Sequence, residues 1–344
     1  MSETERTPVT VLTGYLGAGK TTLLNRILSE DHGRRYAVIV NEFGEIGIDN
    51  DLIVGADEEV FEMSNGCVCC TVRGDLIRVL QGLAKRKGGF DAIVVETTGL
   101  ADPGPVAQTF FVDEDVKART VLDSVTTVVD AKHVTAQLDD SREAREQIAF
   151  ADQIILNKTD LVGEGDLVAL EARLRRLNPL APIHRAQRSN VPLDAILGRG
   201  GFDLDRILTL EPEFLKPAHG EPGHVHDEDC EHDHGHGHGH HDHVHDDDIK
   251  GVALTLDAPV NGAAVSRWLS ELLAAQGPDI LRAKGILNVK GEERRLVFQA
   301  VHMILEGDLQ RPWRDDEPRT SRMVFIGRNL DAAALRSGFE ACAA

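Results

Sequence analysis

Short β-branched runs and helix-like stretches alternate along the first half of this chain of 344 residues. Five runs bounded by polar residues or glycine have the composition of strands, at residues 9–14, 36–44, 91–99, 124–131 and 152–160. Stretches typical of helices lie between these runs, at residues 20–30 and 73–86, and after the last of them, at residues 166–177. Strand and helix in alternation predict parallel βαβ units, and runs that are apolar on both faces predict a sheet covered on both sides. The predicted fold class is therefore α/β, with a mostly parallel sheet flanked by helices.

A phosphate-binding sequence follows the first of these runs. Residues 14–21 read GYLGAGKT, which fits the pattern G-x-x-x-x-G-K-[ST] between a strand and a helix. In this pattern the backbone N–H groups bind phosphate oxygens, the lysine neutralises their charge, and the hydroxyl group ligates Mg²⁺. The sequence thus predicts a P-loop nucleoside triphosphate site, formed by Gly14, Gly17, Ala18, Gly19, Lys20, Thr21 and Thr22.

A second motif selects the base of the nucleotide. The strand-like run DQIIL, residues 152–156, is followed by Asn157, Lys158, Thr159 and Asp160. A carboxylate is an acceptor only, so it can take hydrogen bonds from the N1–H and 2-amino groups of guanine, whereas adenine lacks this pair of donors. Asn157, Lys158 and Asp160 therefore predict GTP rather than ATP. Residues 188–190 are a weaker candidate for a further contact with the base.

An acidic residue at a strand end completes the predicted catalytic set. Glu96 ends the apolar run AIVVE and is followed by two threonines and Gly99. The Glu96 carboxylate can hold a Mg²⁺-bound water, and the Gly99 N–H can approach the γ-phosphate, as in a nucleotide-sensing switch. An acid at a strand end without such a role is the alternative. The predicted catalytic residues are Lys20, Thr21, Glu96 and Gly99.

Three of the five cysteines, Cys67, Cys69 and Cys70, lie within four residues. They fall between the P-loop and Glu96, in the interval where nucleoside triphosphatases carry a switch segment. Thiolates in C-x-C-C spacing can converge on one soft ion, Zn²⁺, Co²⁺ or Cu⁺, with a fourth position open. Glu42 is a further candidate, as a ligand of that ion or in the Mg²⁺ shell with Thr21. A buried structural cluster and a redox switch are the alternatives.

The segment 219–248 differs from the rest of the chain, because it holds eleven of the fifteen histidines and five glycines. It has almost nothing to bury, so a flexible linker is expected. Its imidazoles could bind Zn²⁺, Ni²⁺, Co²⁺ or Cu²⁺ at weak sites, and a solvated linker without a function is the alternative. The predicted organisation is a P-loop domain at 1–215, a linker at 216–249 and a smaller α+β domain at 250–344.

Charge and hydropathy exclude two classes of partner. The formal net charge is −20, and such a surface repels both nucleic acid and anionic lipid. No stretch approaches the roughly eighteen apolar residues of a membrane span. An odd number of cysteines with three in one cluster is not a secreted disulfide framework. We therefore expect a cytoplasmic protein that binds neither nucleic acid nor membrane.

Several segments together resemble the CobW-type metallochaperone GTPases of the SIMIBI class: TVLTGYLGAGKTTLLN, VIVNEFGEIGID, NGCVCC, VVETTGLADP, TVVDAKH and ILNKTDL. Residues 284–307 resemble the C-terminal domain of the same family. By this resemblance, residues 14–21 correspond to the phosphate loop and residues 157–160 to guanine recognition. Cys67, Cys69 and Cys70 correspond to the family's metal-binding motif.

Within the family, residues 96–116 and 122–133 look most similar to the zinc-regulated GTPase metalloprotein activators. The resemblance implies GTP hydrolysis with Mg²⁺ and delivery of Zn²⁺ to a client metalloprotein, the metal being held by the thiolates and released on hydrolysis. Two alternatives stay open: a cobalt chaperone of the cobalamin-synthesis or nitrile hydratase type, and a metal buffer or sensor that uses the His-rich segment. The sequence identifies neither the client nor the oligomeric state, and a homo-oligomer is left open.

Overall fold

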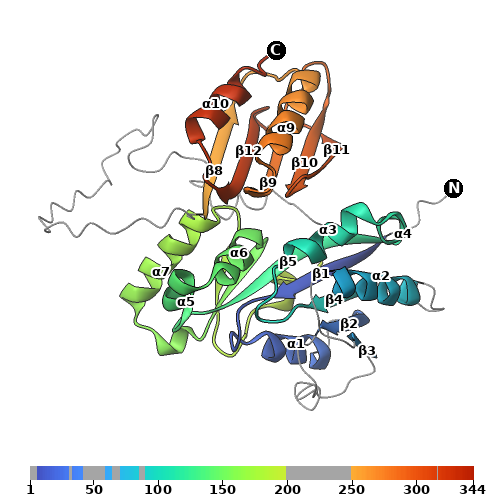
Figure 1. The fold of residues 1–344 in the computed structure, drawn as a ribbon, viewed down its shortest axis with the longest axis vertical. Coiled ribbons are helices and arrows are strands. Elements are labelled where there is room, and N and C mark those ends of the chain that lie inside the picture. The colour runs from blue at the N-terminus through green and yellow to red at the C-terminus, as the bar shows by residue number, and fades with distance from the viewer. Residues whose placement is uncertain are drawn as a thin grey trace, which may run out of the picture.

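The structure is a computed structural model that describes residues 6–30, 33–41, 59–63, 70–84, 90–198, 249–315 and 317–344. These residues form a parallel sheet with its helices and, above it in Figure 1, an antiparallel sheet that comes from the C-terminal third of the chain. The predicted α/β fold is thereby confirmed. The domain limits at residues 215 and 250 stay a prediction.

The first sheet has the order β3-β2-β4-β1-β5-β6-β7, and every pairing between these described strands is parallel. Its strands are β1 (Thr7–Thr13), β2 (Tyr36–Asn41), β3 (Glu59–Met63), β4 (Ala92–Glu96), β5 (Thr120–Asp130), β6 (Gln153–Asn157) and β7 (Ile183–Arg185). The central strands β4 and β6 are buried along their whole length, which explains why their sequences are apolar on both faces.

Helices cover both faces of this sheet. They are α1 (Lys20–Ser29), α2 (Cys70–Ala84), α3 (Gly104–Val112), α4 (Glu114–Arg119), α5 (Val134–Asp140), α6 (Arg142–Phe150) and α7 (Glu164–Leu177), with short 3₁₀ turns η2 (Thr159–Leu161) and η3 (Leu193–Ala195). Helix α1 packs on one face with residues 191–197. Helices α2, α3 and α6 pack on the other face, where α5 and α7 extend the layer. Helices thus lie on both sides of the carboxyl edge of the sheet, where they can position functional side chains.

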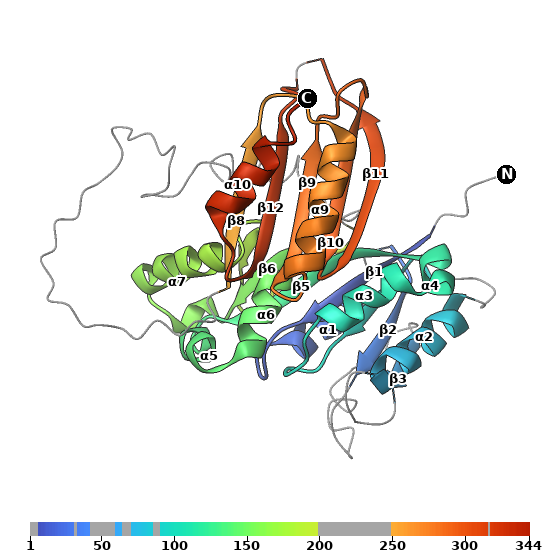
Figure 2. The same cartoon turned by 45° about the horizontal axis from the view of Figure 1, so that its top comes forward.

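The second sheet has the order β11-β10-β9-β12-β8 with antiparallel pairings. Its elements are β8 (Ile249–Leu256), α9 (Gly262–Gln276), β9 (Ile280–Leu287), β10 (Arg294–Val301), β11 (Ile304–Pro312), β12 (Ser321–Arg328) and α10 (Ala332–Glu340). Figure 2 shows α9 and α10 together on one face of this sheet, where they bury a core of their own. The predicted α+β character of the C-terminal part is confirmed.

The opposite face of the second sheet packs against the helices of the first. Leu281, Val301, Val324 and Ile326 belong to the same apolar cluster as Phe110 of α3 and Phe150 of α6. Strand β9 is buried at all of its positions, as expected for a strand covered on both sides. The two sheets therefore share one continuous core, with α3 and α6 between them.

Candidate functional site

The phosphate loop connects β1 to α1 and has a backbone that only glycine can adopt at two positions. Gly14 has a φ of 142° and Gly19 a φ of 111°. A Cβ atom on Gly14 would overlap the carbonyl oxygen of Val128, and one on Gly19 would overlap the side-chain amide of Asn157. Because the loop carries no side chain at these points, its N–H groups can approach phosphate oxygens closely.

Lys20 begins α1 and is held over the start of the phosphate loop. Its Nζ donates to the carbonyl oxygens of Gly14 at 2.8 Å and Tyr15 at 3.3 Å. Only 8% of the residue is exposed, so its charge acts in a largely desolvated place. The N-terminus of α1 adds partial positive charge at the same point. Loop and helix together present the donors that a polyphosphate requires.

Asn157, the last residue of β6, joins the base loop, residues 157–160, to the phosphate loop. Its Nδ2 donates to the carbonyl oxygen of Ala18 at 2.9 Å, and its Oδ1 accepts from the backbone N–H of Ser189 at 2.8 Å. The Ser189 hydroxyl donates to the carbonyl oxygen of Gly19 at 3.0 Å. Three segments that are distant in sequence are thereby held as one unit.

Lys158 makes a second link between the same two loops. It has a φ of 61°, and its Nζ donates to the carbonyl oxygen of Gly17 at 2.8 Å and to Asp130 Oδ2 at 2.7 Å. Asp130 also contacts His133 Nδ1 at 2.9 Å. Burial opposes ionisation of Asp130, but the hydrogen bonds from Lys158 and His133 outweigh it and lower the pKa of the carboxyl group. A carboxylate thus fixes the lysine beside the phosphate loop.

Glu96 ends β4 next to the strand that leads into the phosphate loop. It pairs in register with Leu12 of β1 and is buried. The following residue, Thr97, donates from its N–H to the carbonyl oxygen of Leu12 at 2.9 Å and from its hydroxyl to Thr13 Oγ1 at 2.9 Å. The strand end that carries Glu96 is therefore tied to the end of β1.

Gly99 lies against the phosphate loop. A Cβ on this residue would come within 2.7 Å of the Leu16 backbone nitrogen. From the other side, the buried Gln147 side chain donates to the carbonyl oxygens of Gly99 at 3.1 Å and Ala101 at 3.0 Å. The segment after Glu96 is thus enclosed between the phosphate loop and α6.

The donor set fits Mg²⁺. Thr21 lies half-buried in the first turn of α1, and Glu96 ends the neighbouring β4. Mg²⁺ in nucleotide sites takes one or two oxygen ligands from the protein and completes its shell with phosphates and water. The Thr21 hydroxyl and the Glu96 carboxylate are the residues that would hold it.

The structure brings most of the predicted nucleotide residues to one edge of the first sheet. Those at the ends of β1, β4 and β6 are Gly14, Gly17, Ala18, Gly19, Lys20, Thr21, Thr22, Glu96, Gly99, Asn157, Lys158 and Asp160. Thr22 and Asp160 are exposed, Asp160 on the turn η2. The assignment of roles to these residues stays a prediction.

The predicted metal ligands Glu42, Cys67 and Cys69 lie outside the described residues, and Cys70 is described only as the first residue of α2. In the part of the chain that is described, no three His, Cys, Asp or Glu side chains gather into a metal site. The strand ends nearby are described: Asn41 of β2 pairs in parallel register with Met63 of β3. The thiolate site therefore also stays a prediction.

Asp130 and Gln147 had no role in the sequence predictions, and Ser189 was only part of a weak candidate for a base contact. Asp130 ends β5, within the predicted strand run 124–131, and its position near a strand end was the only signal available. Ser189, within the weak candidate 188–190, is fully buried and has a φ of 55°. Gln147 reads as an ordinary helix residue. Their roles depend on contacts between distant segments, which a sequence pattern does not reveal.

Within the described ranges, no helix has the length and apolar character of a membrane span. Comparison with protein families matches the CobW/HypB/UreG nucleotide-binding domain to residues 8–185 and the cobalamin synthesis protein cobW C-terminal domain to residues 249–343. Both matches agree with the two sheets of the structure.

Two relatives extend this result. The zinc chaperone YjiA of Escherichia coli is 38% identical over 336 residues, 96% of this chain and 97% of that protein. The zinc-regulated GTPase metalloprotein activator 1 of Schizosaccharomyces pombe is 46% identical over 183 residues, 51% of this chain and 44% of that protein.

The fold matches a solved relative along its full length. The crystal structure of Zn(II)-bound YjiA GTPase has a TM-score of 0.72 and 34% identity, over 99% of this chain and 100% of that one. A Zn(II)-bound YjiA variant, with one glutamate and two cysteines replaced by alanine, matches equally well, with a TM-score of 0.72 and 35% identity over the same shares. The resemblance expected from the sequence is thereby confirmed. The chain belongs to the CobW/HypB/UreG family of nucleotide-binding proteins, and it carries the cobW C-terminal domain as its second part.

Proposed function

We propose that this chain is a GTP-hydrolysing zinc metallochaperone, which carries Zn²⁺ as cargo and transfers it to a client metalloprotein. The nucleotide-binding part of the proposal is supported by the hydrogen bonds between the base loop and the phosphate loop, from Asn157 to Ala18 and from Lys158 to Gly17. The zinc-cargo part of the proposal is supported by three thiols in C-x-C-C spacing and by two relatives, a zinc chaperone and a zinc-regulated GTPase metalloprotein activator.

Each part of the nucleotide site has a chemical task in this proposal. The N–H groups of the phosphate loop, Lys20 and the N-terminus of α1 stabilise the negative charge of the triphosphate. Asp160 accepts hydrogen bonds from guanine. Bound Mg²⁺, held by Thr21 and Glu96, supplies further neutralisation of the phosphate charge. The Gly99 N–H binds the γ-phosphate, so the segment after Glu96 distinguishes GTP from GDP.

The cargo site follows strand ends at the same edge of the sheet. Glu42 comes directly after β2, and the segment with Cys67 and Cys69 comes directly after β3, two strands whose final residues are paired in parallel. Strand β2 is in turn paired with β4, where Val40 is in register with Glu96. In this proposal GTP tightens the thiolate site and hydrolysis loosens it, so Zn²⁺ must tighten GTP binding by the same factor.

A titration with three nucleotides tests the nucleotide-binding part of the proposal. We expect GTP to bind about 10–100-fold more tightly than ITP, because inosine lacks the 2-amino donor that Asp160 accepts, and ATP to bind more weakly still. Asp160→Ala should abolish the preference, whereas Asp166→Ala, at an exposed aspartate on α7, should retain it. Equal affinity for GTP and ATP would contradict guanine recognition.

Competition against a zinc chelator tests the zinc-cargo part of the proposal. The number of bound ions is not diagnostic, because the YjiA variant that lacks two cysteines and a glutamate is Zn(II)-bound. We expect Cys67→Ser to weaken the tightest Zn²⁺ site at least tenfold, whereas Cys342→Ser, at a buried cysteine of the C-terminal part, leaves it unchanged. If deletion of residues 219–248 removes the tightest site and Cys67→Ser does not, the chain is a His-based buffer instead. Co²⁺ titrated in parallel identifies a cobalt chaperone by tighter binding at the same cysteines.

A further inference from the structure

Helix α6 contacts the predicted nucleotide-sensing segment on one side. Gln147 Nε2 donates to the carbonyl oxygens of Gly99 and Ala101, and this side chain is almost fully buried. The Gln147 carbonyl oxygen accepts from the Thr127 hydroxyl of β5 at 2.8 Å. The helix and the segment beside the phosphate loop are therefore fixed to each other by side-chain and backbone bonds.

The residue before Gln147 contacts the C-terminal sheet. Glu146 forms an ion pair with Arg328 of β12 and accepts from Arg142 Nε at 2.8 Å. Glu146 is buried, and Arg328 is almost as well buried, so water screens their attraction little. Adjacent residues of one short helix thus bind the sensing segment and the second sheet.

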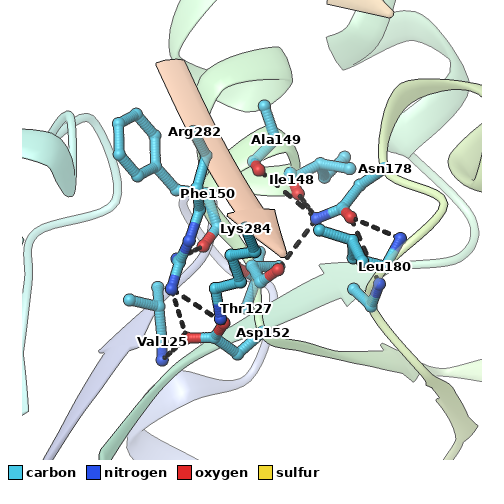
Figure 3. A network of polar contacts seen from close by, with 12 residues as sticks. Val125, Thr127, Ile148, Ala149, Phe150, Asp152, Asn178, Leu180, Arg282 and Lys284 are labelled. Carbon is cyan, nitrogen blue, oxygen red and sulfur yellow. Dashed lines mark hydrogen bonds and ion pairs between the residues drawn. The ribbon is translucent and has the colours of Figure 1, made fainter. Parts of the chain in front are cut away.

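A second ionic contact holds the end of α6. Figure 3 shows Arg282, from β9, reaching both the Phe150 carbonyl oxygen and the carboxylate of Asp152, where its Nη2 lies 2.8 Å from each oxygen. Lys284 pairs with the same carboxylate. In the same view Asn178 donates to carbonyl oxygens at the end of α6, those of Ile148 and Ala149. The carbonyl oxygens at the end of α6 thus accept hydrogen bonds both from the second sheet and from Asn178.

The C-terminal sheet also lies against the residues that follow the sensing segment. His302 lies in the turn between β10 and β11 with a φ of 51°, and its ring packs against Phe150 with 5.3 Å between the centroids. A Cβ on Gly104 would lie 2.9 Å from His302 Nε2 and 3.0 Å from the Asp102 carboxylate. The hairpin turn therefore rests on the residues that follow Gly99 and Ala101.

We propose that α6 couples the segment Gly99–Asp102 to the C-terminal sheet, so that the bound nucleotide controls how this sheet packs on the first. The inference rests on the proposed function, in which Gly99 reads the γ-phosphate. A shift of Gly99 toward the phosphate acts on the bonds to Gln147, and through α6 on the pairing of Glu146 with Arg328. This coupling is reciprocal: the factor by which GTP in place of GDP changes the packing equilibrium of the C-terminal sheet is also the factor by which this packing changes the preference for GTP over GDP.

The ratio of affinities for a non-hydrolysable GTP analogue and GDP tests this coupling. Arg328→Gln leaves Glu146 paired with Arg142, and His302→Asn keeps a residue that tolerates positive φ, so both variants should fold. We expect each to change the ratio about 2–30-fold, the range that coupling residues typically show. The control is Glu306→Gln, which breaks the ion pair of β11 with Lys117 of α4 without touching α6, and should leave the ratio within twofold.

Hydrogen exchange of residues 294–312 gives a second readout. We expect the exchange rates of this hairpin to differ between the analogue-bound and GDP-bound states, and the difference to disappear in Gln147→Ala. Equal rates in the two states, or an effect of Glu306→Gln as large as that of Arg328→Gln, would overturn the coupling. A chain that binds GTP selectively but shows an unchanged ratio in both interface variants loses only this inference. A chain that binds no guanine nucleotide loses the proposed function as well.

Discussion

Asn157 and Ser189 are joined by two hydrogen bonds, from Ser189 N to Asn157 Oδ1 at 2.8 Å and from Asn157 Nδ2 to Ser189 Oγ at 3.2 Å. Arg26 of α1 reinforces the same loop, because its Nη1 donates to the Ser189 carbonyl oxygen and, at 3.1 Å, to that of Val191. The helix after the phosphate loop, the base loop and the loop after β7 thus support one another.

Removing the Asn157 side chain should weaken nucleotide binding. Asn157→Ala loses the donor to Ala18 and leaves the Ser189 N–H unsatisfied in a buried place, which costs about 1–3 kcal/mol. We expect GTP affinity to fall about 10–100-fold in a fluorescent-nucleotide titration. Asn288→Ala, at a buried asparagine of the second sheet, should lower the melting temperature but keep GTP affinity within twofold. Equal losses of GTP affinity in the two variants would mean that Asn157 affects only the stability of the fold.

Asp130→Asn tests the carboxylate that holds Lys158. The pKa of Asp130 is lowered on folding, so the charge stabilises the native state above the ordinary pKa of 3.8 and the contribution is lost as pH falls through the native pKa. Because Lys158 is about one-third exposed, we expect only about 1 kcal/mol at pH 7 in urea unfolding. The gap between the two proteins should not narrow from pH 8 to pH 5. A gap that closes within that range would contradict the assignment.

Arg282 should be the most costly charge to remove at the junction of the sheets. It is 2% exposed, and Arg282→Met leaves Asp152, whose side chain is 12% exposed, with one cation instead of two. Removing one partner of a buried pair costs about 3–5 kcal/mol, and because Lys284 still pairs with Asp152 we expect a loss near the lower end, about 3 kcal/mol. Arg294→Met removes an exposed pair with Glu292 and should cost less than about 1 kcal/mol. Denaturant unfolding of both variants measures the two losses of stability. Similar values would show that water screens the charges around Asp152.

Lys284 should give the native state a pH dependence in alkaline solution. Burial, with the charge of Arg282, lowers the pKa of Lys284 to about 8. Between that value and the ordinary 10.5 the unfolded chain binds more protons, so stability relative to Lys284→Met should rise with pH, by up to about 1.4 kcal/mol per pH unit. Unfolding free energies at pH 7.5, 8.5 and 9.5 check this. A difference that stays flat or falls over these points would refute the lowered pKa.

The sequence predicted the parallel sheet because β1, β2, β4, β5 and β6 are β-branched and apolar on both faces. Strand β3 was not predicted, because Glu59–Met63 is an edge strand whose two glutamates interrupt the apolar run. Helix α3 was also missed. Its sequence GPVAQTFFV has no polar stripe, since it packs between the first sheet and the second.

Some residues of the candidate site could likewise be predicted from the sequence, and others could not. Gly14, Lys20 and Asn157 could be predicted, because short motifs fix their positions relative to a strand end. Gln147 and the cation pair of β9 could not be predicted, since each acts through a partner in a distant segment. Arg282 and Lys284 alternate with apolar residues in β9, a pattern that reads from sequence as a solvent-exposed face, yet their partner Asp152 comes from the connection between α6 and β6.

In the proposed function, the thiolates and the triphosphate site act on each other. This coupling is tested most directly by titrating Zn²⁺ against a competing chelator in nucleotide-free protein and in protein loaded with a non-hydrolysable GTP analogue. We expect tighter Zn²⁺ binding with the analogue, by about 5–150-fold, and loss of that gain in Cys67→Ser. Superimposable titration curves for the two wild-type samples would contradict it.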